Sequence, residues 1–265
     1  MALKYPDIDP ILVSIGPLEI RWYSLAYIFG ILIGAFYINF LAKKIKFKLP
    51  PKFIEDLIVA AVLGVVIGGR LGYIVVYSLD YYIKNPLEIL QLQQMGMSFH
   101  GGLIGYFIGI IILCRRYKID YWKICDLSAC VAPIGLFLGR IANFINGELF
   151  GRITDVSWAM KFPMGGPFLR HPSQIYEALT EGLLLFIIIN ILFFKCEFYK
   201  KTKLLTGIFV MLYATFRIFS ECFRDPDIQI GYILGYFTMG QVLSSMIFLV
   251  GLYLVALAQR VKLVK

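Results

Sequence analysis

The sequence predicts an all-α, polytopic integral membrane protein with about seven transmembrane helices. Two observations predict this class, the composition and the length of the apolar runs. Of the 265 residues, 59% are hydrophobic and only 16% are charged, and the mean hydropathy is +0.76. A soluble domain cannot bury so much apolar surface. Because a helix needs roughly 20 apolar residues to cross the ~30 Å hydrocarbon layer, we expect residues 1–265 to form a single integral membrane domain with short loops.

Seven apolar stretches mark the expected spans, with edges uncertain by several residues. They cover residues 20–42, 53–80, 98–114, 124–146, 174–194, 204–220 and 232–258. Asp7 and Asp9 precede the first stretch, in place of a basic start and a small-residue cleavage site, so no removable signal peptide is expected. Residues 81–97 are expected to lie along the outer interface, and residues 147–173 to form a small extramembrane cap on the outer side.

Lysine and arginine gather at every second junction between the expected spans. Sixteen of the 26 basic residues follow the first, third, fifth and seventh spans. They are Lys43, Lys44, Lys46, Lys48, Lys52, Arg115, Arg116, Lys118, Lys123, Lys195, Lys200, Lys201, Lys203, Arg260, Lys262 and Lys265. Because the cytoplasmic ends of spans collect such residues, the sequence predicts a multi-pass membrane protein with these four junctions on the cytoplasmic side. Its N-terminus is expected outside and its C-terminus in the cytoplasm.

The same distribution argues against two other classes. The net charge of +9 mostly reflects topology, and no soluble basic face is expected that could bind nucleic acid. The five cysteines are scattered, without a CxxC pair or a His-rich partner sequence. We therefore expect no disulfide framework and no metal site, and we interpret the cysteines as small packing residues.

Glycines repeated at every fourth position indicate close packing between spans. The series are Gly64-Gly68-Gly72, Gly101-Gly105-Gly109, Gly30-Gly34 and Gly135-Gly139. Small residues at this spacing let helix backbones approach each other inside a membrane. We favour this structural role over direct contact with a ligand.

Arginines inside the expected spans are the strongest functional signal. Arg70, Arg140 and Arg217 lie in the outer halves of three spans, where a charge costs at least ~2.5–3.5 kcal/mol on insertion scales. Arg217, Glu221 and Arg224 share one face of the sixth span. One carboxylate between two guanidinium groups leaves a net positive charge, which suits an anionic ligand better than a purely structural network. For Arg70 and Arg224, simple pairing with an acid or reach to the interface stays an open alternative.

Amide side chains stand beside one of these arginines. Arg140 and Asn143 share a face at the outer end of the fourth span, and Asn146 and Glu148 follow as the chain emerges. A guanidinium group with two amides complements a phosphodiester and neighbouring hydroxyl groups.

Histidine supplies the candidate for proton transfer. His100 begins the third span, and the expected topology places it at the outer interface with Tyr23 of the first span. A histidine titrates near neutral pH, so His100 is the first candidate for a general base. His171 stands beside Pro172 and is interpreted first as a turn and helix-start element.

Several motifs resemble the bacterial prolipoprotein diacylglyceryl transferases, over nearly the whole chain. The most specific is the run Gly139-Arg140-Ile141-Ala142-Asn143-Phe144-Ile145-Asn146-Gly147-Glu148, accompanied by the runs 100–105 and 171–177. The resemblance implies transfer of the diacylglyceryl group of phosphatidylglycerol to the thiol of the lipobox cysteine of lipoprotein precursors. A thioether forms and glycerol 1-phosphate leaves. It implies no cofactor and no metal, and its partners are phosphatidylglycerol, precursor signal peptides and other membrane lipids. It also implies a multi-pass protein of the bacterial cytoplasmic (inner) membrane.

The resemblance also implies roles for individual residues. We expect four catalytic residues, of which His100 and Tyr23 are alternative proton acceptors, and seven substrate-binding residues. The catalytic set is His100, Arg140, Arg217 and Tyr23, and the substrate-binding set is Arg70, Asn143, Asn146, Glu148, Gly151, Glu221 and Arg224.

A membrane transporter for an anionic solute or lipid is the main alternative, because it too would place arginines inside a helix bundle. Transporter sites usually lie near the bilayer midplane, between related repeats with broken helices. Here the polar residues are expected on one side and no repeat is convincing. A structural membrane protein would not need this polar set, so the transferase is preferred.

Overall fold

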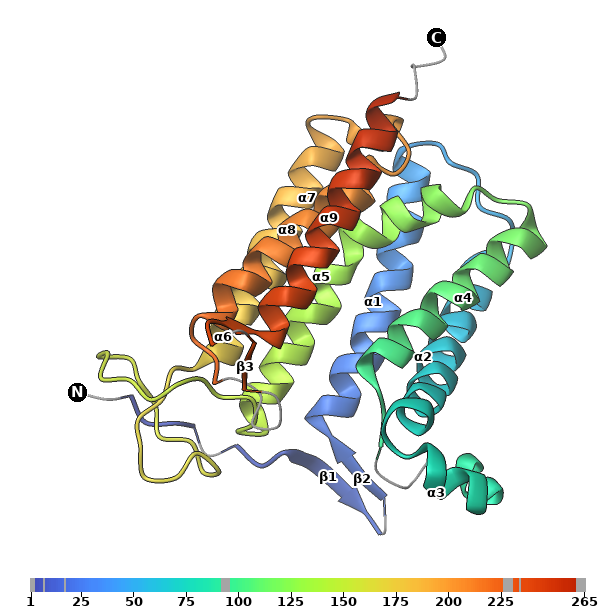
Figure 1. The fold of residues 1–265 in the computed structure, drawn as a ribbon. Coiled ribbons are helices and arrows are strands. Elements are labelled where there is room, and N and C mark those ends of the chain that lie inside the picture. The colour runs from blue at the N-terminus through green and yellow to red at the C-terminus, as the bar shows by residue number, and fades with distance from the viewer. Residues whose placement is uncertain are drawn as a thin grey trace. The chain divides into compact units, whose positions relative to one another are not determined.

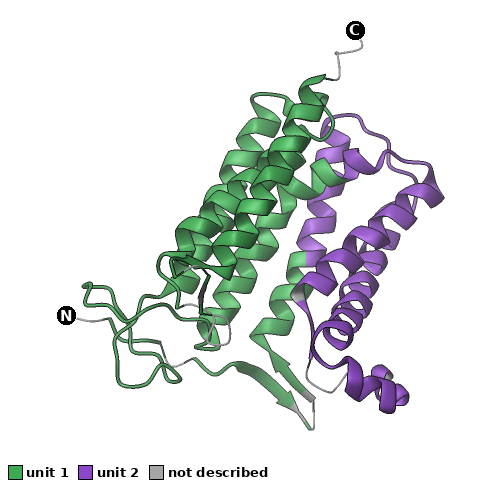
Figure 2. Cartoon of the chain, viewed as in Figure 1, with its two compact units in different colours: residues 1–30, 125–265 green, residues 31–124 purple. Residues whose placement is uncertain are grey.

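The computed structural model describes residues 3–6, 8–16, 18–91, 96–225, 231–233 and 235–260, and most of them are helical (Figure 1). The chain divides into two compact units, which are described separately here (Figure 2). The first comprises Met1–Gly30 and Cys125–Lys265, and the second comprises Ile31–Ile124.

Six helical stretches are long and apolar enough to cross a membrane among the described residues. They are α1 (Trp22–Lys44), α2 (Phe53–Tyr77), α5 (Tyr121–Ile145), the continuous stretch Ser173–Phe194, α8 (Leu204–Glu221) and α9 (Met239–Arg260). The all-α, multi-span prediction is confirmed. The expected third span is helix α4 (Phe99–Tyr117), whose glycines, histidine and paired arginines lower its hydropathy. It is not among the six, and a total of seven spans therefore stays a prediction.

Short elements join the long helices. Strands β1 (Ile11–Ile15) and β2 (Leu18–Arg21) form an antiparallel hairpin before α1. Within the segment expected along the interface, α3 (Leu79–Lys84) precedes a 3₁₀ turn at Pro86–Leu90. Another 3₁₀ turn, Phe198–Lys200, precedes α8.

The start of the last span was predicted too early. Residues 232–238 were expected to be helical, but they hold a second hairpin, β3 (Tyr232–Ile233) with β4 (Phe237–Thr238), and α9 begins at Met239. A short apolar run rich in aromatic and β-branched residues suits a strand as well as a helix, which explains the error.

The second unit is built around the crossing of α2 and α4. A Cβ atom at Gly105 would stand 2.0 Å from the Gly64 carbonyl oxygen, and one at Gly68 would stand 2.4 Å from the Gly101 oxygen. Real Cβ atoms do not approach so closely, so these backbones touch directly. The predicted packing role of both glycine series is confirmed.

The first unit brings α5, α7, α8 and α9 side by side (Figure 1). The stretch Ser173–Phe194 consists of α6 (Ser173–Glu177), a π-helical segment (Ala178–Leu184) and α7 (Leu185–Phe194). Buried Asp126 of α5 accepts hydrogen bonds from the backbone nitrogens of Lys203 and Thr206, at 2.8 and 2.9 Å. This carboxylate satisfies free N–H groups at the start of α8, and the helix dipole favours a negative charge there.

The predicted glycines of α1 and α5 do not all pack closely. A Cβ atom at Gly30 of α1 would meet the Gly135 Cα of α5 at 3.4 Å, so this pair lies at a close approach. A Cβ atom at Gly139 would meet nothing within 4 Å. The packing role expected for Gly139 is therefore wrong, and open space borders α5 at that position.

Candidate active site

Six charged side chains of the first unit gather into one cluster. Arg140 comes from α5, Glu177 and Glu181 from the stretch Ser173–Phe194, and Arg217, Glu221 and Arg224 from α8 and the turn that follows it. We call these six residues the charge cluster. An unpaired charge inside an apolar span is costly, because its lost hydration is not replaced. Each of these six side chains is therefore stabilised by the opposite charges around it.

Glu177 is the hub of the charge cluster. Its carboxylate is fully buried and lies 2.7 Å from Arg140 Nε, 3.2 Å from Arg217 Nη1 and 2.8 Å from Arg224 Nη1. One carboxylate thus meets three guanidinium groups from different parts of the chain. It fixes their positions relative to one another, as ion pairs held in low dielectric surroundings do.

Glu221 holds the other end of the cluster. It pairs with Arg217 one helical turn earlier, lies 3.4 Å from Arg224 Nε and accepts a hydrogen bond from Thr238 Oγ1 at 2.9 Å. A Cβ atom at Gly240 would lie 2.5 Å from the Glu221 carboxyl carbon. The start of α9 therefore needs a glycine where it packs against Glu221.

The net positive charge predicted for Arg217, Glu221 and Arg224 is wrong for the assembled cluster. Glu177 and Glu181 arrive from another span, so three arginines meet three glutamates and the formal charges sum to zero. The cluster is nevertheless polarised. The arginine side chains keep 16–19% of their surface exposed, whereas the carboxylates keep 0–6%. Its accessible face is therefore cationic, with the carboxylates buried more deeply.

A patch of two amides and one carboxylate lies where α5 ends. Asn143 Nδ2 and Asn146 Nδ2 both donate to Glu148 Oε1, at 2.8 and 3.1 Å. Gln174 Nε2 donates to the Glu148 carbonyl oxygen at 2.5 Å. Asn143, Asn146 and Glu148 therefore lie together, and their role in substrate binding stays a prediction. The buried Oδ1 of Asn146 has no hydrogen-bond partner among the described residues, so it offers an acceptor to a hydroxyl group.

Tyr23 belongs to the same unit. It lies in the first turn of α1, and its hydroxyl is 3.3 Å from the Tyr27 hydroxyl. The charges of Glu148 and Arg140 both act on this phenol. Tyr23 is thus within electrostatic range of Arg140, and its catalytic role stays a prediction.

The segment 147–173 is ordered by backbone bridges and by one arginine. Isolated bridges join Gly151 to Arg224 and Met160 to Arg170, and the Arg170 guanidinium group donates to the Gly165 and Gly151 carbonyl oxygens and to Asp225. A Cβ atom at Gly151 would lie 2.3 Å from the Phe223 carbonyl oxygen. Gly151 thus lets this segment lie against the turn that carries Arg224.

His171 plays the structural part expected of it. It precedes α6, and its Nδ1 lies 3.1 Å from the Tyr176 hydroxyl, which also accepts a hydrogen bond from Trp158 Nε1 at 2.6 Å. Partial burial lowers the pKa of His171, which favours the neutral imidazole.

Comparison with known proteins assigns the family. The family model of prolipoprotein diacylglyceryl transferase matches residues 10–257. A phosphatidylglycerol–prolipoprotein diacylglyceryl transferase of Rickettsia felis is 52% identical over 253 residues, covering 96% of this chain and 98% of that protein. One of Allorhizobium ampelinum is 49% identical over 265 residues, covering 97% and 92%. The chain belongs to the prolipoprotein diacylglyceryl transferase family. It is a membrane transferase, and the transporter alternative is not supported.

Two predicted site residues of this transferase lie in the second unit. His100 is exposed in the first turn of α4, which Ser98 caps by accepting a hydrogen bond from the Gly101 nitrogen at 3.2 Å. Arg70 is buried and donates to three carbonyl oxygens of residues 88–91, at 2.9–3.2 Å. These are the contacts of an anchoring residue. The approach of His100 and Arg70 to the charge cluster stays a prediction.

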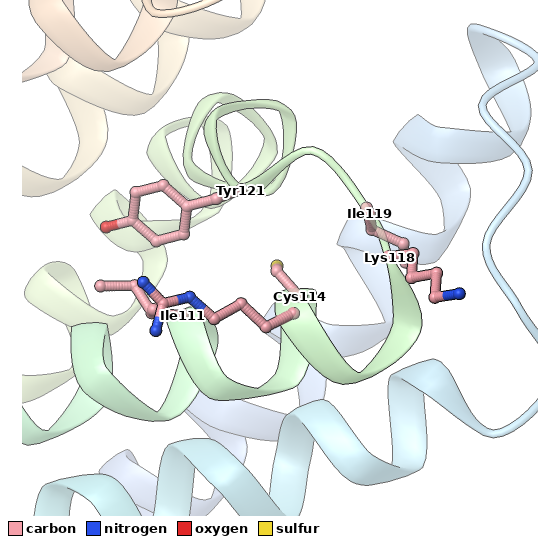
Figure 3. Close-up of a pocket in the computed structure, with 6 residues that line it drawn as sticks. Ile111, Cys114, Lys118, Ile119 and Tyr121 are labelled. Carbon is pink, nitrogen blue, oxygen red and sulfur yellow. The ribbon is translucent and has the colours of Figure 1, made fainter.

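A pocket of about 360 Å³ lies at the far end of α4, lined by Ile111, Cys114, Arg115, Lys118, Ile119 and Tyr121. The Lys118 ammonium group points away from the Tyr121 hydroxyl, so these polar ends do not converge on one ligand (Figure 3). Within the described parts of the chain, no three His, Cys, Asp or Glu side chains are arranged to hold a metal ion.

Two residues of the charge cluster were missed from the sequence. Glu177 was noticed only as part of the run 171–177, and Glu181 was not considered. Both are carboxylates inside an apolar span at a spacing of four, which was itself a usable signal.

Proposed function

We propose that this protein transfers the diacylglyceryl group of phosphatidylglycerol to the thiol of the lipobox cysteine in a lipoprotein precursor. The products are a thioether-linked lipoprotein precursor and glycerol 1-phosphate. One observation carries the proposal, namely a cationic, accessible face of three arginines held by buried carboxylates inside a helix bundle. The name of the family states the transferred group and the prolipoprotein acceptor, and the names of its close relatives add phosphatidylglycerol.

The cluster suits the phosphodiester of the donor lipid. Arg140 and Arg217 lie on two different helices and share Glu177 and Glu181 as counter-ions, so their guanidinium groups are positioned before any ligand arrives. A guanidinium group offers planar, paired donors that match phosphate oxygens. The patch of Asn143, Asn146 and Glu148 offers donors and acceptors to the glycerol hydroxyl groups of the headgroup.

The reaction itself is a displacement at carbon. The precursor thiolate attacks the glyceryl carbon that bears the phosphate, a C–S bond forms and the C–O bond breaks. The bonding electrons pass to the phosphate oxygen, which leaves with its glycerol. Negative charge therefore grows on the phosphate in the transition state, and preorganised cationic donors stabilise it there. Arg140 and Arg217 are assigned this role.

The thiol proton needs an acceptor. His100 and Tyr23 are the candidates, and a histidine has the more suitable proton affinity near neutral pH. The nucleophilic sulfur comes from the precursor, so none of the five cysteines of this chain needs to be activated.

We further propose that the site lies on the outer side of the cytoplasmic membrane. Basic residues at alternate junctions support this orientation. A reporter fused at the C-terminus should be cytoplasmic and one at the N-terminus external. Termini on the same side would contradict the seven-span orientation.

A direct assay tests the proposed activity. Purified protein is incubated with phosphatidylglycerol and a precursor peptide that carries a lipobox cysteine, and a matched peptide with serine at that position serves as the control. Lipidated peptide and one equivalent of glycerol 1-phosphate are expected from the cysteine peptide only. Release of glycerol 1-phosphate without lipidated peptide would identify a lipase instead.

A further inference from the structure

Glu181 is the weakest-held member of the charge cluster. Its side chain is fully buried, yet neither carboxylate oxygen has a hydrogen-bond partner among the described residues. Its nearest cations are Arg140 Nη2 at 3.6 Å and Arg217 Nη1 at 3.7 Å. Glu177, by contrast, lies within 3.2 Å of three guanidinium groups. A buried carboxylate with only two long ion-pair contacts is poorly compensated for the loss of its hydration.

The backbone around Glu181 is also unusual. Residues Ala178–Leu184 form a π-helix, a rare conformation that often marks functional positions. A Cβ atom at Gly182 would stand 2.7 Å from Phe137 Cβ, so α5 holds this segment closely at the next residue. Glu181 therefore lies in an irregular helical segment that packs tightly against α5.

The net charge of the cluster changes when an anion binds. The cluster is formally neutral when empty, so a phosphodiester adds one negative charge and the departing phosphate develops more. Four charged groups act on Glu181. They are Arg140 from α5, Glu177 from its own helix, and Arg217 and Arg224 from α8 and its end, and the Tyr213 phenol is also within electrostatic range.

We propose that Glu181 is a releasable counter-ion. It holds Arg140 and Arg217 in position in the empty site and yields them to the lipid phosphate, while Glu177 keeps all three arginines anchored throughout. When the phosphate product must leave, Glu181 competes for the same two arginines and so speeds its release. This inference rests on the proposed function, because the anion in question is the headgroup of the donor lipid.

The test is Glu181→Gln, which keeps the shape of the side chain and removes its charge. The Glu181 carboxylate repels a phosphate bound to the same arginines. At an effective dielectric near 20, removal of this one negative charge should raise the affinity for the anion about tenfold or more. We expect the KM for phosphatidylglycerol to fall about tenfold and inhibition by added glycerol 1-phosphate to strengthen about tenfold, while kcat falls as product release slows. Glu181→Met, which is similar in size and apolar, should shift both constants in the same direction if the amide is not tolerated.

Two controls separate this role from a structural one. Glu197→Gln makes the same change at an exposed residue that pairs with Lys200, and it should leave both constants unchanged. Glu177→Gln should act in the opposite direction and raise the KM, because three arginines lose their common anchor. A purely structural Glu181 would give variants with lower thermal stability and weaker anion binding.

The outcomes distinguish the inference from the proposed function. Wild-type transfer with unchanged constants in folded Glu181→Gln would overturn the inference alone, as would weaker anion binding. If the wild-type protein does not transfer at all, the proposed function fails. Calorimetric titration of wild type and variant with glycerol 1-phosphate still decides the counter-ion exchange, since that binding needs no turnover. Tighter binding to the variant supports the exchange, and equal binding contradicts it.

Discussion

The crossing of α2 and α4 in the second unit and the charge cluster in the first unit solve opposite problems inside an apolar span. At the crossing, glycines of α2 and α4 let two backbones touch, with approaches that leave no room for a methyl group. The cluster contains six charges, and its arginines stay partly exposed while its carboxylates are buried. Close packing serves stability in the first case. Costly, polarised charge in the second is the reason why we propose it as the place of the chemistry.

The largest effect is expected from Arg217, which contacts all three glutamates of the cluster. Arg217→Ala should lower the transfer rate by about 10³-fold, at the upper end for loss of one electrostatic stabiliser. Arg224→Ala should cost only about tenfold, because Arg224 lies beyond the end of α8 and contacts two of the glutamates. Arg217→Lys should rescue poorly, since one ammonium group cannot match a planar fork of donors.

A double variant separates phosphate contact from charge balance. Arg217→Ala leaves an excess buried negative charge, and adding Glu181→Gln restores neutrality without restoring the guanidinium group. Compared with Arg217→Ala alone, the double variant should be more thermally stable but equally inactive. Recovery of transfer in the double variant would show that Arg217 only balances charge.

The glycine crossing should respond in stability instead. Gly105→Ala places a methyl group 2.0 Å from the Gly64 carbonyl oxygen, and such overpacking typically costs about 1–3 kcal/mol. The measurement is the thermal unfolding midpoint of the purified protein, together with the transfer rate per folded molecule. The rate should be unchanged. Gly135→Ala is the matched control, because a Cβ atom there meets nothing within 4 Å. Equal stability of the two variants would remove the packing account of this crossing.

The smallest effect is expected at Gly139, which precedes Arg140 and borders open space. Gly139→Ala should leave thermal stability unchanged, or raise it slightly through helix propensity. If the acyl chains or glycerol of the donor lipid use this space, the KM for phosphatidylglycerol should rise a few-fold, and further in Gly139→Leu. A normal KM in the leucine variant would show that the lipid lies elsewhere.

The α2–α4 crossing could be predicted from the sequence more completely than the charge cluster. The glycine series predicted the α2–α4 crossing correctly, because a repeat of small residues every four positions is a local pattern that encodes a helix face. The charge balance could not be predicted from Arg217, Glu221 and Arg224 alone, since Glu177 and Glu181 reach them only through the packing of another span. Gly139 carries the same spacing signal as Gly105 but faces open space. Spacing shows which residues share a face and does not show what lies opposite.

The division of labour between phosphate stabilisation and proton transfer is the central claim. The most direct test measures the transfer rate against pH for Arg140→Ala and His100→Asn, at matched folding and saturating lipid. Arg140→Ala should lose about 10²–10³-fold at every pH, because the charge on the leaving phosphate is unchanged.

His100→Asn should recover as the pH approaches about 8.5, the usual pKa of a cysteine thiol, where the substrate ionises unaided. A constant His100→Asn deficit would pass the proton-accepting role to Tyr23. Arg140→Ala with a nearly normal rate, or with a deficit that vanishes at high pH, would contradict the assignment of the charge cluster as the phosphate site.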